Sequence, residues 1–212
     1  MIRLATDADH AMDAADAVHT EHTVDAEHAV HAEHAAQPAP AGTEAGAPAD
    51  VPGPVRALVI TVSTRAASGV YEDRSGPLLA TLLREVPGPL SVDGPRVVPD
   101  GPRLADVLAA AVAADYDVVI TTGGTGLSRD DRTPEATRRV LDLEIPGIPE
   151  LLRSTGVAAG VPTAVFSRGV AGLAGRVFVV NLPGSTGAVR DAMSVLGPLL
   201  GEIVRHSRGG SH

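Results

Sequence analysis

The sequence predicts an α/β fold, a three-layer sandwich in which helices flank a mostly parallel central sheet. Short runs rich in valine and isoleucine alternate along the chain with segments whose leucines and valines recur at helical spacing. Each apolar run is bounded by glycine, proline or small polar residues, and several helical segments open on a proline. Strands that alternate with helices in this way form parallel sheets with helices on both faces.

Charge divides the 212 residues into two regions. Residues 1–52 contain ten acidic residues and one arginine, whereas residues 53–212 contain sixteen acidic residues and sixteen arginines. The first region repeats Ala, His, Asp and Glu and ends in a Pro/Ala/Gly linker, so we interpret residues 1–52 as a disordered or weakly helical tail. Residues 53–212 form the expected folded domain, and their balanced charge does not favour nucleic acid as a partner.

Six of the eight histidines lie in that tail, several of them three residues apart. On a helix, this spacing would bring imidazoles to one face, where they could bind zinc or nickel. A low-complexity, solvated segment whose histidines have no dedicated role is the favoured alternative.

Composition excludes several kinds of site. The chain has no cysteine and no lysine, which excludes a thiolate zinc site, a cysteine nucleophile and a P-loop lysine. A bound phosphate must therefore be held by backbone N–H groups, arginine or a metal ion. No stretch approaches the roughly 20 apolar residues that span a bilayer, and the N-terminus lacks the apolar segment of a signal peptide. We expect a cytoplasmic protein with no membrane contact.

The first half of the expected domain contains two strands and two helices. The run Val55–Ser63 is β-branched and apolar, as in a strand covered on both faces. Ser75 is the expected N-cap of a helix with Pro77 in its first turn. A shorter strand is expected in Leu90–Asp100, followed by an amphipathic helix, opened by a proline, in Gly101–Ala114.

The second half continues this alternation. Tyr116–Thr122 is an expected buried strand, and Thr133–Glu144 an expected helix with Thr133 as its N-cap. Two short strands are expected in Thr163–Arg168 and Arg176–Gly184, and a last helix from about Thr186 to Arg205.

Polar clusters follow four of the apolar runs. Ligands bind beyond the carboxyl ends of the strands in open parallel sheets, so these four loops are the candidates for a binding site. They are Ser63–Arg65, Pro99–Gly101, Thr121–Gly126 and Asn181–Thr186.

The third of these loops, TTGGTG, has the composition of an anion-binding turn. Gly123, Gly124 and Gly126 permit positive φ and a close approach of ligand to backbone. Successive N–H groups in such a turn form a concavity for an anion, and threonine hydroxyls can add donors. The spacing matches neither the dinucleotide-binding fingerprint nor the P-loop, and a tight structural turn between strand and helix is the alternative.

Two aspartates, Asp130 and Asp131, follow this loop. A carboxylate pair beside a phosphate cradle would repel the phosphates unless a divalent cation lay between them, and Mg²⁺ is the expected ion. Asp100 could add a carboxylate from a neighbouring strand end. The alternative is that these aspartates cap helices, Asp100 before Pro102 and Asp130 or Asp131 before Thr133. Both interpretations can be true at once.

Several motifs together resemble the molybdenum-cofactor biosynthesis domain family. The resemblance rests on TTGGTG followed at short range by DRTPEAT, and on matching stretches in the expected order, VSTRAASGVYEDRSGPLL, VVPDG, EIPGIPELLR, TAVFSRGVAG and VFVVNLPGST. It covers residues 55–205. It implies an α/β domain, commonly a homotrimer, that transfers AMP from ATP to molybdopterin with magnesium. The terminal phosphate of molybdopterin would attack the α-phosphorus of ATP, pyrophosphate would leave, and a molybdenum-insertion enzyme would receive the product.

The resemblance also implies roles for particular residues. Asp100 and Asp131 would be the catalytic and metal-binding carboxylates. The substrate-binding residues would be Ser63, Arg65, Thr122, Gly123, Gly124, Thr125 and Gly126, together with Ser167, Arg168, Pro183, Gly184 and Ser185 on the pterin side. Many members have Ser-Asp-Arg where this chain has Thr64 in the middle position, so one carboxylate is missing. A non-catalytic molybdopterin-binding or carrier module on the same fold is the alternative function.

Overall fold

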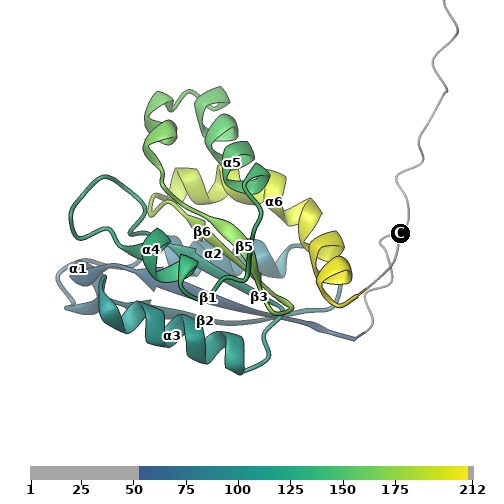
Figure 1. The fold of residues 1–212 in the computed structure, drawn as a ribbon. Coiled ribbons are helices and arrows are strands. Elements are labelled where there is room, and N and C mark those ends of the chain that lie inside the picture. The colour runs from purple at the N-terminus through teal and green to yellow at the C-terminus, as the bar shows by residue number, and fades with distance from the viewer. Residues whose placement is uncertain (1–52, 210–212) are drawn as a thin grey trace, which may run out of the picture. The chain divides into compact units, whose positions relative to one another are not determined.

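The computed structural model describes residues 53–209, and the expected tail with its six histidines lies outside them. The described residues form the expected α/β architecture (Figure 1). In chain order the elements are β1 (Val55–Val62), α1 (Thr64–Ala67), α2 (Ser75–Arg84), β2 (Leu90–Val98), α3 (Pro102–Ala113), β3 (Val118–Thr122), α4 (Thr133–Arg138), β4 (Leu143–Glu144), α5 (Gly147–Ala158), the 3₁₀ helix η1 (Pro162–Phe166), β5 (Ala171–Ala174), β6 (Val177–Leu182) and α6 (Thr186–Ser207).

The sheet is mostly parallel, as expected. Its six strands lie in the order β2-β1-β3-β6-β5-β4. The four strands β2, β1, β3 and β6 run parallel, whereas β5 and β4 are antiparallel to their neighbours. The carboxyl ends of the four parallel strands therefore meet at one edge.

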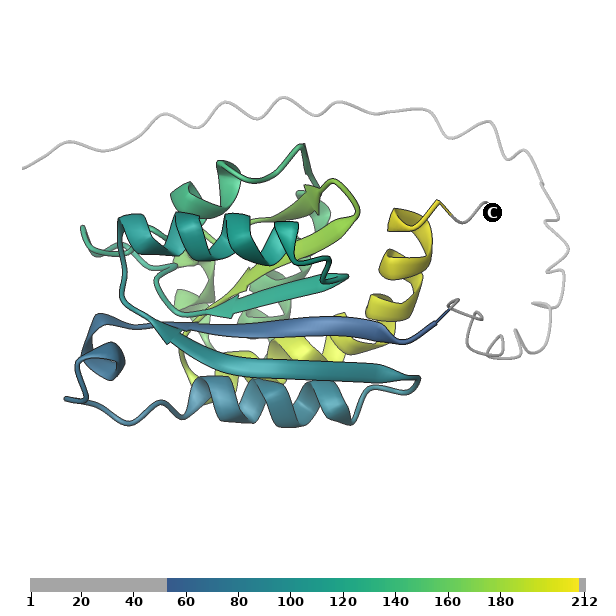
Figure 2. The ribbon, with the colours of Figure 1, turned by 90° about the horizontal axis from the view of Figure 1, so that it is seen from below.

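Helices cover both faces of this sheet, and Figure 2 shows the sheet between α3 on one side and α2 with α6 on the other. In strand β1, alternate residues face the helices on opposite sides of the sheet. Its residues Ala57 and Val59 belong to the core beneath α2 and α6, and Leu58 and Ile60 belong to the core beneath α3. All four are fully buried. A strand buried on both faces needs an unbroken apolar run, which is why this strand could be recognised from sequence.

A buried polar network joins β3, β6 and α4 close to the carboxyl edge. The Asn181 side-chain amide donates to Thr121 Oγ1 at 3.0 Å and to Thr137 Oγ1 at 2.9 Å, and its carbonyl accepts from Val170 N–H at 3.2 Å. Thr137 in turn donates to the carbonyl of Thr133 at 2.9 Å. Since these residues are buried and each makes at least one of these hydrogen bonds, the network fixes α4 against the two strands.

A buried ion pair lies at the opposite end of the strands. The carboxylate of Asp117, 5% exposed, pairs with Arg208 at the end of α6 at 2.7 Å and accepts from Arg56 N–H at 2.8 Å. Burial alone would raise the pKa of Asp117, but the bonds from Arg208 and Arg56 outweigh it and lower that pKa. This pair stabilises the attachment of α6 to the sheet.

The expected helix over Thr133–Glu144 is wrong in its second half. Helix α4 ends at Arg138, and the chain then pairs with β5 through bonds from Asp142 N–H to Leu173 O and from Ile145 N–H to Ala171 O, both 2.8 Å. Pairing at the sheet edge thus replaces the helical hydrogen bonds that Leu143 and Glu144 would have made.

The expected strand over Thr163–Arg168 is also wrong. Residues Pro162–Phe166 form a 3₁₀ helix, with bonds from Ala164 N–H to Val161 O at 3.0 Å and from Ser167 N–H to Ala164 O at 3.1 Å. Segment β5, which the sequence did not indicate, supplies the strand instead. Helix α5, likewise, was not expected.

Two smaller expectations also need correction. Strand β2 has nine residues and is longer than the eight-residue β1, not shorter. Ser75 is the first residue of α2 and not its N-cap. The capping acceptor is Asp73, whose Oδ1 accepts from Gly76 N–H at 3.0 Å. In the part of the chain that the structure describes, no helix combines the length and apolar character needed to cross a membrane.

Candidate active site

The four loops predicted as binding loops meet at the carboxyl edge of the sheet. Together they border a cleft of about 1300 Å³. The contributing segments are Ser63–Arg65 after β1, Asp100–Gly101 after β2, Thr122–Gly124 after β3 and Gly184–Ser185 after β6. Because the parallel strands deliver all four ends to one edge, residues far apart in sequence share one cleft.

The glycine turn after β3 is shaped by close packing of the backbone. Gly123 and Gly124 adopt φ of +101° and +63°, a region that residues with a Cβ rarely occupy. A Cβ on Gly123 would collide with the carbonyl oxygen of Val62, and a Cβ on Gly124 would lie 2.5 Å from Asp100 Oδ1 and closer still to Thr133 Oγ1. The turn therefore brings the backbone against an aspartate that the sequence predicted to be functional.

Asp100 and Asp131 lie close together around this turn. Burial and repulsion by Asp131 raise the pKa of Asp100, while its hydrogen bonds with Thr64 act in the opposite direction. Oδ1 of Asp100 is buried without a hydrogen-bond partner among the described residues. Oδ2 of Asp131 accepts from Ser128 N–H at 3.2 Å and faces Gly126, where a Cβ would lie 2.8 Å away.

The alternative that these aspartates cap helices is wrong. Gly101 is the N-cap of α3 and Arg132 is the N-cap of α4, and neither cap involves a side-chain hydrogen bond. The carboxylates of Asp100 and Asp131 are thus directed to the cleft edge and the loop rather than to a helix end.

A divalent cation fits this pair of carboxylates. It would satisfy the unpartnered oxygen of Asp100 and offset the repulsion between Asp100 and Asp131. Within residues 53–209, no cluster of three or more His, Asp or Glu side chains could hold a metal by itself. In proteins, Mg²⁺ is commonly bound by one or two carboxylates, and phosphates of the substrate complete its coordination.

A second, smaller cavity of about 460 Å³ adjoins the first. Both cavities are bordered by Gly123, Gly124, Asp131, Gly184 and Ser185, so they meet at the glycine turn. The smaller one is also lined by Thr125, Gly126, Phe166, Ser167 and Pro183. Two adjoining cavities that share one carboxylate are an arrangement suited to two ligands that react with each other.

Three of the predicted binding residues also have local structural roles. Ser63 caps α1 by accepting from Ala66 N–H, and Ser185 caps α6 by accepting from Ala188 N–H, both at 3.2 Å. Thr122 donates to the carbonyl of Pro183 at 2.9 Å, which joins the third loop to the fourth. All of them remain at the border of the larger cleft.

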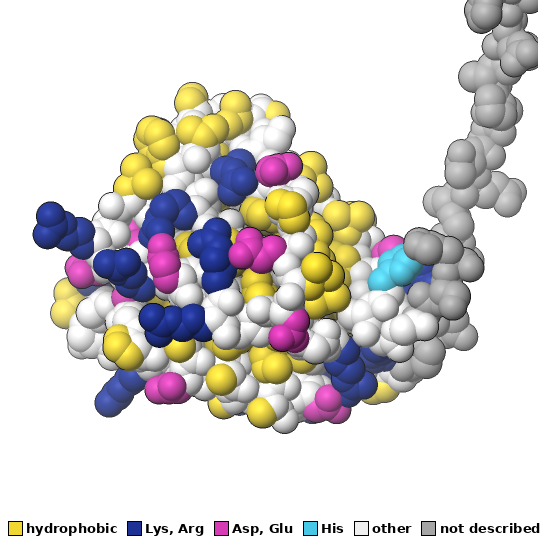
Figure 3. Space-filling view, in the orientation of Figure 1, with side chains coloured by type: hydrophobic (Ala, Val, Ile, Leu, Met, Phe, Trp, Pro, Cys, Tyr) yellow, Lys and Arg dark blue, Asp and Glu magenta, His cyan; other side chains and the backbone are white. Residues whose placement is uncertain are grey.

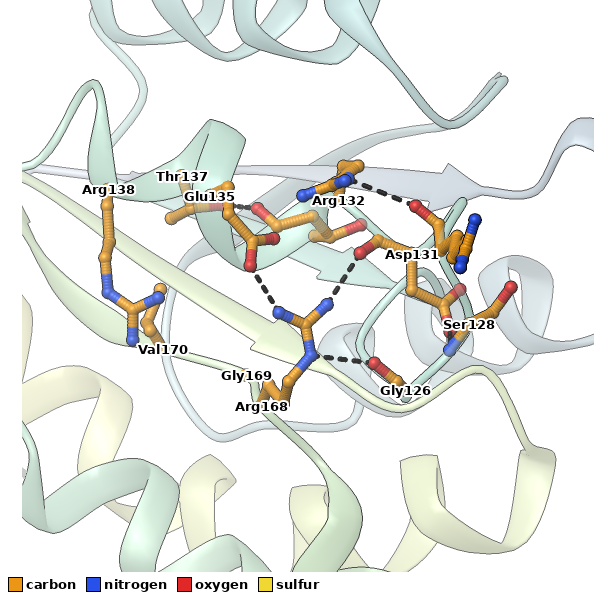
Figure 4. Close-up of polar contacts among 12 residues, drawn as sticks. Gly126, Ser128, Asp131, Arg132, Glu135, Thr137, Arg138, Arg168, Gly169 and Val170 are labelled. Atoms are coloured by element: carbon orange, nitrogen blue, oxygen red, sulfur yellow. Dashed lines mark hydrogen bonds and ion pairs between the residues drawn. The ribbon is translucent and has the colours of Figure 1, made fainter.

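Arg168, expected on the pterin side, does not line either cavity. Figure 4 shows its guanidinium beneath the loop, where it donates to the carbonyls of Gly126 and Asp131 and pairs with Glu135. Burial raises the pKa of Glu135, but the hydrogen bond and charge of Arg168, together with the backbone N–H of Glu135 and the charge of Arg132, lower that pKa overall. The contacts of Arg168 are therefore with the protein.

Arg65 lies at the cleft, as predicted, and three further arginines that were not predicted also line it, namely Arg74, Arg129 and Arg132. Figure 3 shows arginine side chains with acidic ones between them on the face over α4 and its preceding loop. The signal was present in the stretches EDRS and SRDDR, where charge is concentrated next to the predicted loops. In a chain without lysine, these arginines are the cationic side chains that a polyphosphate would meet.

Fold and site together define an α/β protein with a cleft at the carboxyl edge of a mostly parallel sheet, the place where proteins of this class bind their ligands. The sequence matches the family described as "Probable molybdopterin binding domain" over residues 58–202. The chain therefore belongs to this family, which confirms the resemblance found in its motifs.

Individual similar proteins support the assignment to this family. A Helicobacter pylori J99 protein named "Molybdopterin adenylyltransferase" is 37% identical over 145 residues, covering 67% of this chain and 81% of that protein. The Escherichia coli K12 protein of the same name is 32% identical over 155 residues, covering 72% of this chain and 78% of its own length. The crystal structure of a molybdopterin biosynthesis protein from Mycobacterium abscessus is similar with a TM-score of 0.68 at 44% identity, covering 72% and 95% of the two chains.

Proposed function

We propose that this protein acts in molybdenum cofactor biosynthesis by transferring AMP from ATP to molybdopterin, giving adenylyl-molybdopterin and pyrophosphate. The observation that carries the proposal is that Asp100 lies against Gly124 and Asp131 against Gly126, so both carboxylates border the larger cleft at the glycine turn. That point lies where the two cavities meet. The names of its relatives support the same reaction.

The larger cleft is the proposed site of ATP. Arg65, Arg74, Arg129 and Arg132 line it and would bind the β- and γ-phosphates. The smaller cavity, with Phe166, Ser167 and Pro183 in its lining, would receive molybdopterin. Its terminal phosphate would then approach the α-phosphorus of ATP at the glycine turn.

In the reaction, an oxygen of the pterin phosphate forms a new bond to the α-phosphorus. The bond from the α-phosphorus to the oxygen bridging to the β-phosphorus breaks, and pyrophosphate leaves with that electron pair. The glycine turn would contribute by allowing backbone N–H groups to approach the phosphate closely. Positioning and charge neutralisation of this kind are the main contributions a protein makes to such a transfer.

Asp100 and Asp131 would hold Mg²⁺, in the arrangement that their geometry fits. When bound, the ion would neutralise phosphate charge in the cleft. The two carboxylates would fix the ion beside the glycine turn, and Thr64 would orient Asp100, whose N–H donates to Thr64 Oγ1 at 3.2 Å.

An assay with purified full-length protein, ATP, Mg²⁺ and molybdopterin tests the proposal. Adenylylated pterin and pyrophosphate should form in equal amounts. Absence of product from the wild-type protein, under conditions in which one of the named relatives is active, would refute the proposed function.

Thr64, at a position where many family members have aspartate, gives the carrier alternative a specific basis. A carrier would bind molybdopterin without consuming ATP. The variant Asp131→Asn separates the two functions, since it should retain pterin binding and lose turnover by about a hundredfold or more if the carboxylate is catalytic. A carrier would have no turnover to lose.

We also propose that the protein is a cytoplasmic homotrimer that passes its product to a molybdenum-insertion enzyme. Val165 and Phe166 of η1 are 56% and 53% exposed, and exposed apolar side chains of this kind favour association. Sedimentation analysis should give three times the chain mass, and a monomer at micromolar concentration would refute the trimer.

A further inference from the structure

Arg168 contacts the loop that carries Asp131 at both of the loop's ends. Its Nε donates to the carbonyl of Gly126 at 2.8 Å, and its Nη2 donates to the carbonyl of Asp131 at 2.6 Å. Its backbone N–H also donates to the carbonyl of Thr125 at 2.9 Å. Figure 4 shows the guanidinium between these two carbonyls and α4. The start and the end of the loop are thus both attached to the segment before β5.

The hydrogen bonds inside the loop are local. Ser128 N–H donates to Asp131 Oδ2 and Asp131 N–H donates to Ser128 O, each at 3.2 Å, while Asp130 N–H lies 3.4 Å from Ser128 Oγ. These bonds shape the turn but do not fix its position relative to the sheet. Leu127, 68% exposed, adds little packing. The position of the loop therefore depends on contacts from outside it.

Glu135 completes the arrangement from the first turn of α4. Its carboxylate pairs with Nη1 of Arg168. Three nitrogens of one guanidinium thus serve three different acceptors, which a planar guanidinium can do and a lysine ammonium at one point cannot. Oε2 of Glu135 is buried and has no hydrogen-bond partner among the described residues, so the contact with Arg168 is made through Oε1.

We propose that Arg168 and Glu135 are positioning residues, a clamp that holds the loop Gly126–Asp131 so that the Asp131 carboxylate stays beside Asp100. The link is short. Asp131 Oδ2 lies against Gly126, where a Cβ would be 2.8 Å from it, and the carbonyl of Gly126 is one that Arg168 holds. A displacement of either loop end would therefore move the carboxylate. This inference rests on the proposed function for its catalytic consequence, but its structural part can be tested separately.

The structural test uses tryptic cleavage of the full-length protein after Arg129, within the loop, and after Arg132, directly behind it; both arginines are exposed. The variant Arg168→Lys should be cleaved there about tenfold faster than wild type, because a single ammonium cannot donate to both loop carbonyls and to Glu135 at once. Arg176→Lys is the matched control, since Arg176 pairs with Asp115 on an exposed surface and should leave the cleavage rate unchanged. Equal loop cleavage in both variants would overturn the clamp.

A second pair of variants covers the case in which Arg168→Lys does not fold. Glu135→Ala leaves Arg168 in place and should still raise loop cleavage severalfold. Glu150→Ala is its control, because Glu150 occupies the first turn of α5 in the same way and lies outside the clamp. An unchanged cleavage rate in Glu135→Ala would also overturn the inference.

The kinetic test separates positioning from substrate binding. In Arg168→Lys, the Mg²⁺ concentration for half-maximal activity should rise by about ten- to a hundredfold, the range for losing a residue that orients a metal ligand. The KM for molybdopterin should change less than twofold. If Arg168 binds the pterin directly, that KM rises instead while the Mg²⁺ dependence and loop cleavage stay the same, which would overturn the inference. An inactive wild-type protein would refute the proposed function and leave the cleavage test to decide the clamp.

Discussion

Replacing Gly124 by alanine tests whether the glycine turn positions Asp100 at the cleft. The added Cβ would lie 2.5 Å from Asp100 Oδ1 and closer to Thr133 Oγ1, although real Cβ contacts essentially never fall below 3.0 Å. Both oxygens are buried. The methyl group can be accommodated only if Asp100 or the N-terminus of α4 moves.

Gly175→Ala is a matched control for this substitution. Gly175 has φ of +57°, close to the +63° of Gly124, but nothing lies within 4 Å of its Cβ position. Left-handed backbone costs a residue with a Cβ about 1–2 kcal/mol at either site. The clash at Gly124 adds about 1–3 kcal/mol, the usual cost of overpacking. Gly124→Ala should therefore lower the free energy of unfolding by about 2–5 kcal/mol, and Gly175→Ala by about 1–2 kcal/mol.

Urea unfolding and turnover, measured on both variants, check this reasoning. A shift of Asp100 by about 1 Å should reduce turnover roughly a hundredfold in Gly124→Ala. Gly175→Ala should keep wild-type turnover, since Gly175 lies in the turn between β5 and β6 and lines neither cavity. If the two variants agree within about 0.5 kcal/mol and both remain active, the steric argument for Gly124 is refuted.

Two further predictions concern a buried ion pair and the missing carboxylate. Asp117→Asn should lower the free energy of unfolding by about 3 kcal/mol at pH 7, because it breaks a buried pair with Arg208. The exposed Asp115→Asn control should cost at most about 1 kcal/mol. Since the folded pKa of Asp117 is lowered, its contribution is complete above the ordinary pKa of about 3.9 and declines as the pH falls through the folded value. A pH-independent difference in urea unfolding between pH 7 and 3 would contradict this. Thr64→Asp should lower the melting temperature by about 2–4 °C without Mg²⁺, because the new carboxylate would be repelled by Asp100. Added Mg²⁺ should restore the melting temperature. A decrease that Mg²⁺ does not change would count against a metal at Asp100.

The sequence was sufficient for the parts of the fold that need burial on both faces. Strands β1, β3 and β6 lie in the middle of the sheet. Each is a nearly continuous apolar run, as expected for a strand that is buried on both faces. Their order along the chain also indicated where the polar loops would meet. The approach of Asp100 to the glycine turn followed from topology, since β2 and β3 both flank β1.

Short edge segments could not be predicted in the same way. Leu143 and Glu144 continue a helical pattern in sequence, but two backbone bonds to β5 at the sheet edge decide their structure. Residues Thr163–Arg168 have the composition of a strand, yet Val165 and Phe166 are more than half exposed. In both cases a tertiary contact, or the lack of a neighbouring strand, outweighs local propensity.

The role of Arg168 shows a further limit for the site. Its position in a matching motif indicated importance but not which atoms it touches. Its side-chain bonds span 33 to 42 residues of sequence, and their acceptors include two backbone carbonyls, which carry no sequence signal. The aspartate caps failed for a related reason, since cap geometry depends on backbone angles at Gly101 and Arg132 that composition does not fix.

The most direct test of the central claim is a crystal structure with a non-hydrolysable ATP analogue and Mn²⁺ in place of Mg²⁺, located by anomalous scattering. The ion should lie between Asp100 and Asp131, about 2.0–2.3 Å from a carboxylate oxygen of each, with phosphate oxygens of the analogue completing its coordination. An ion bound to the phosphates alone, with neither carboxylate in contact, would contradict the account.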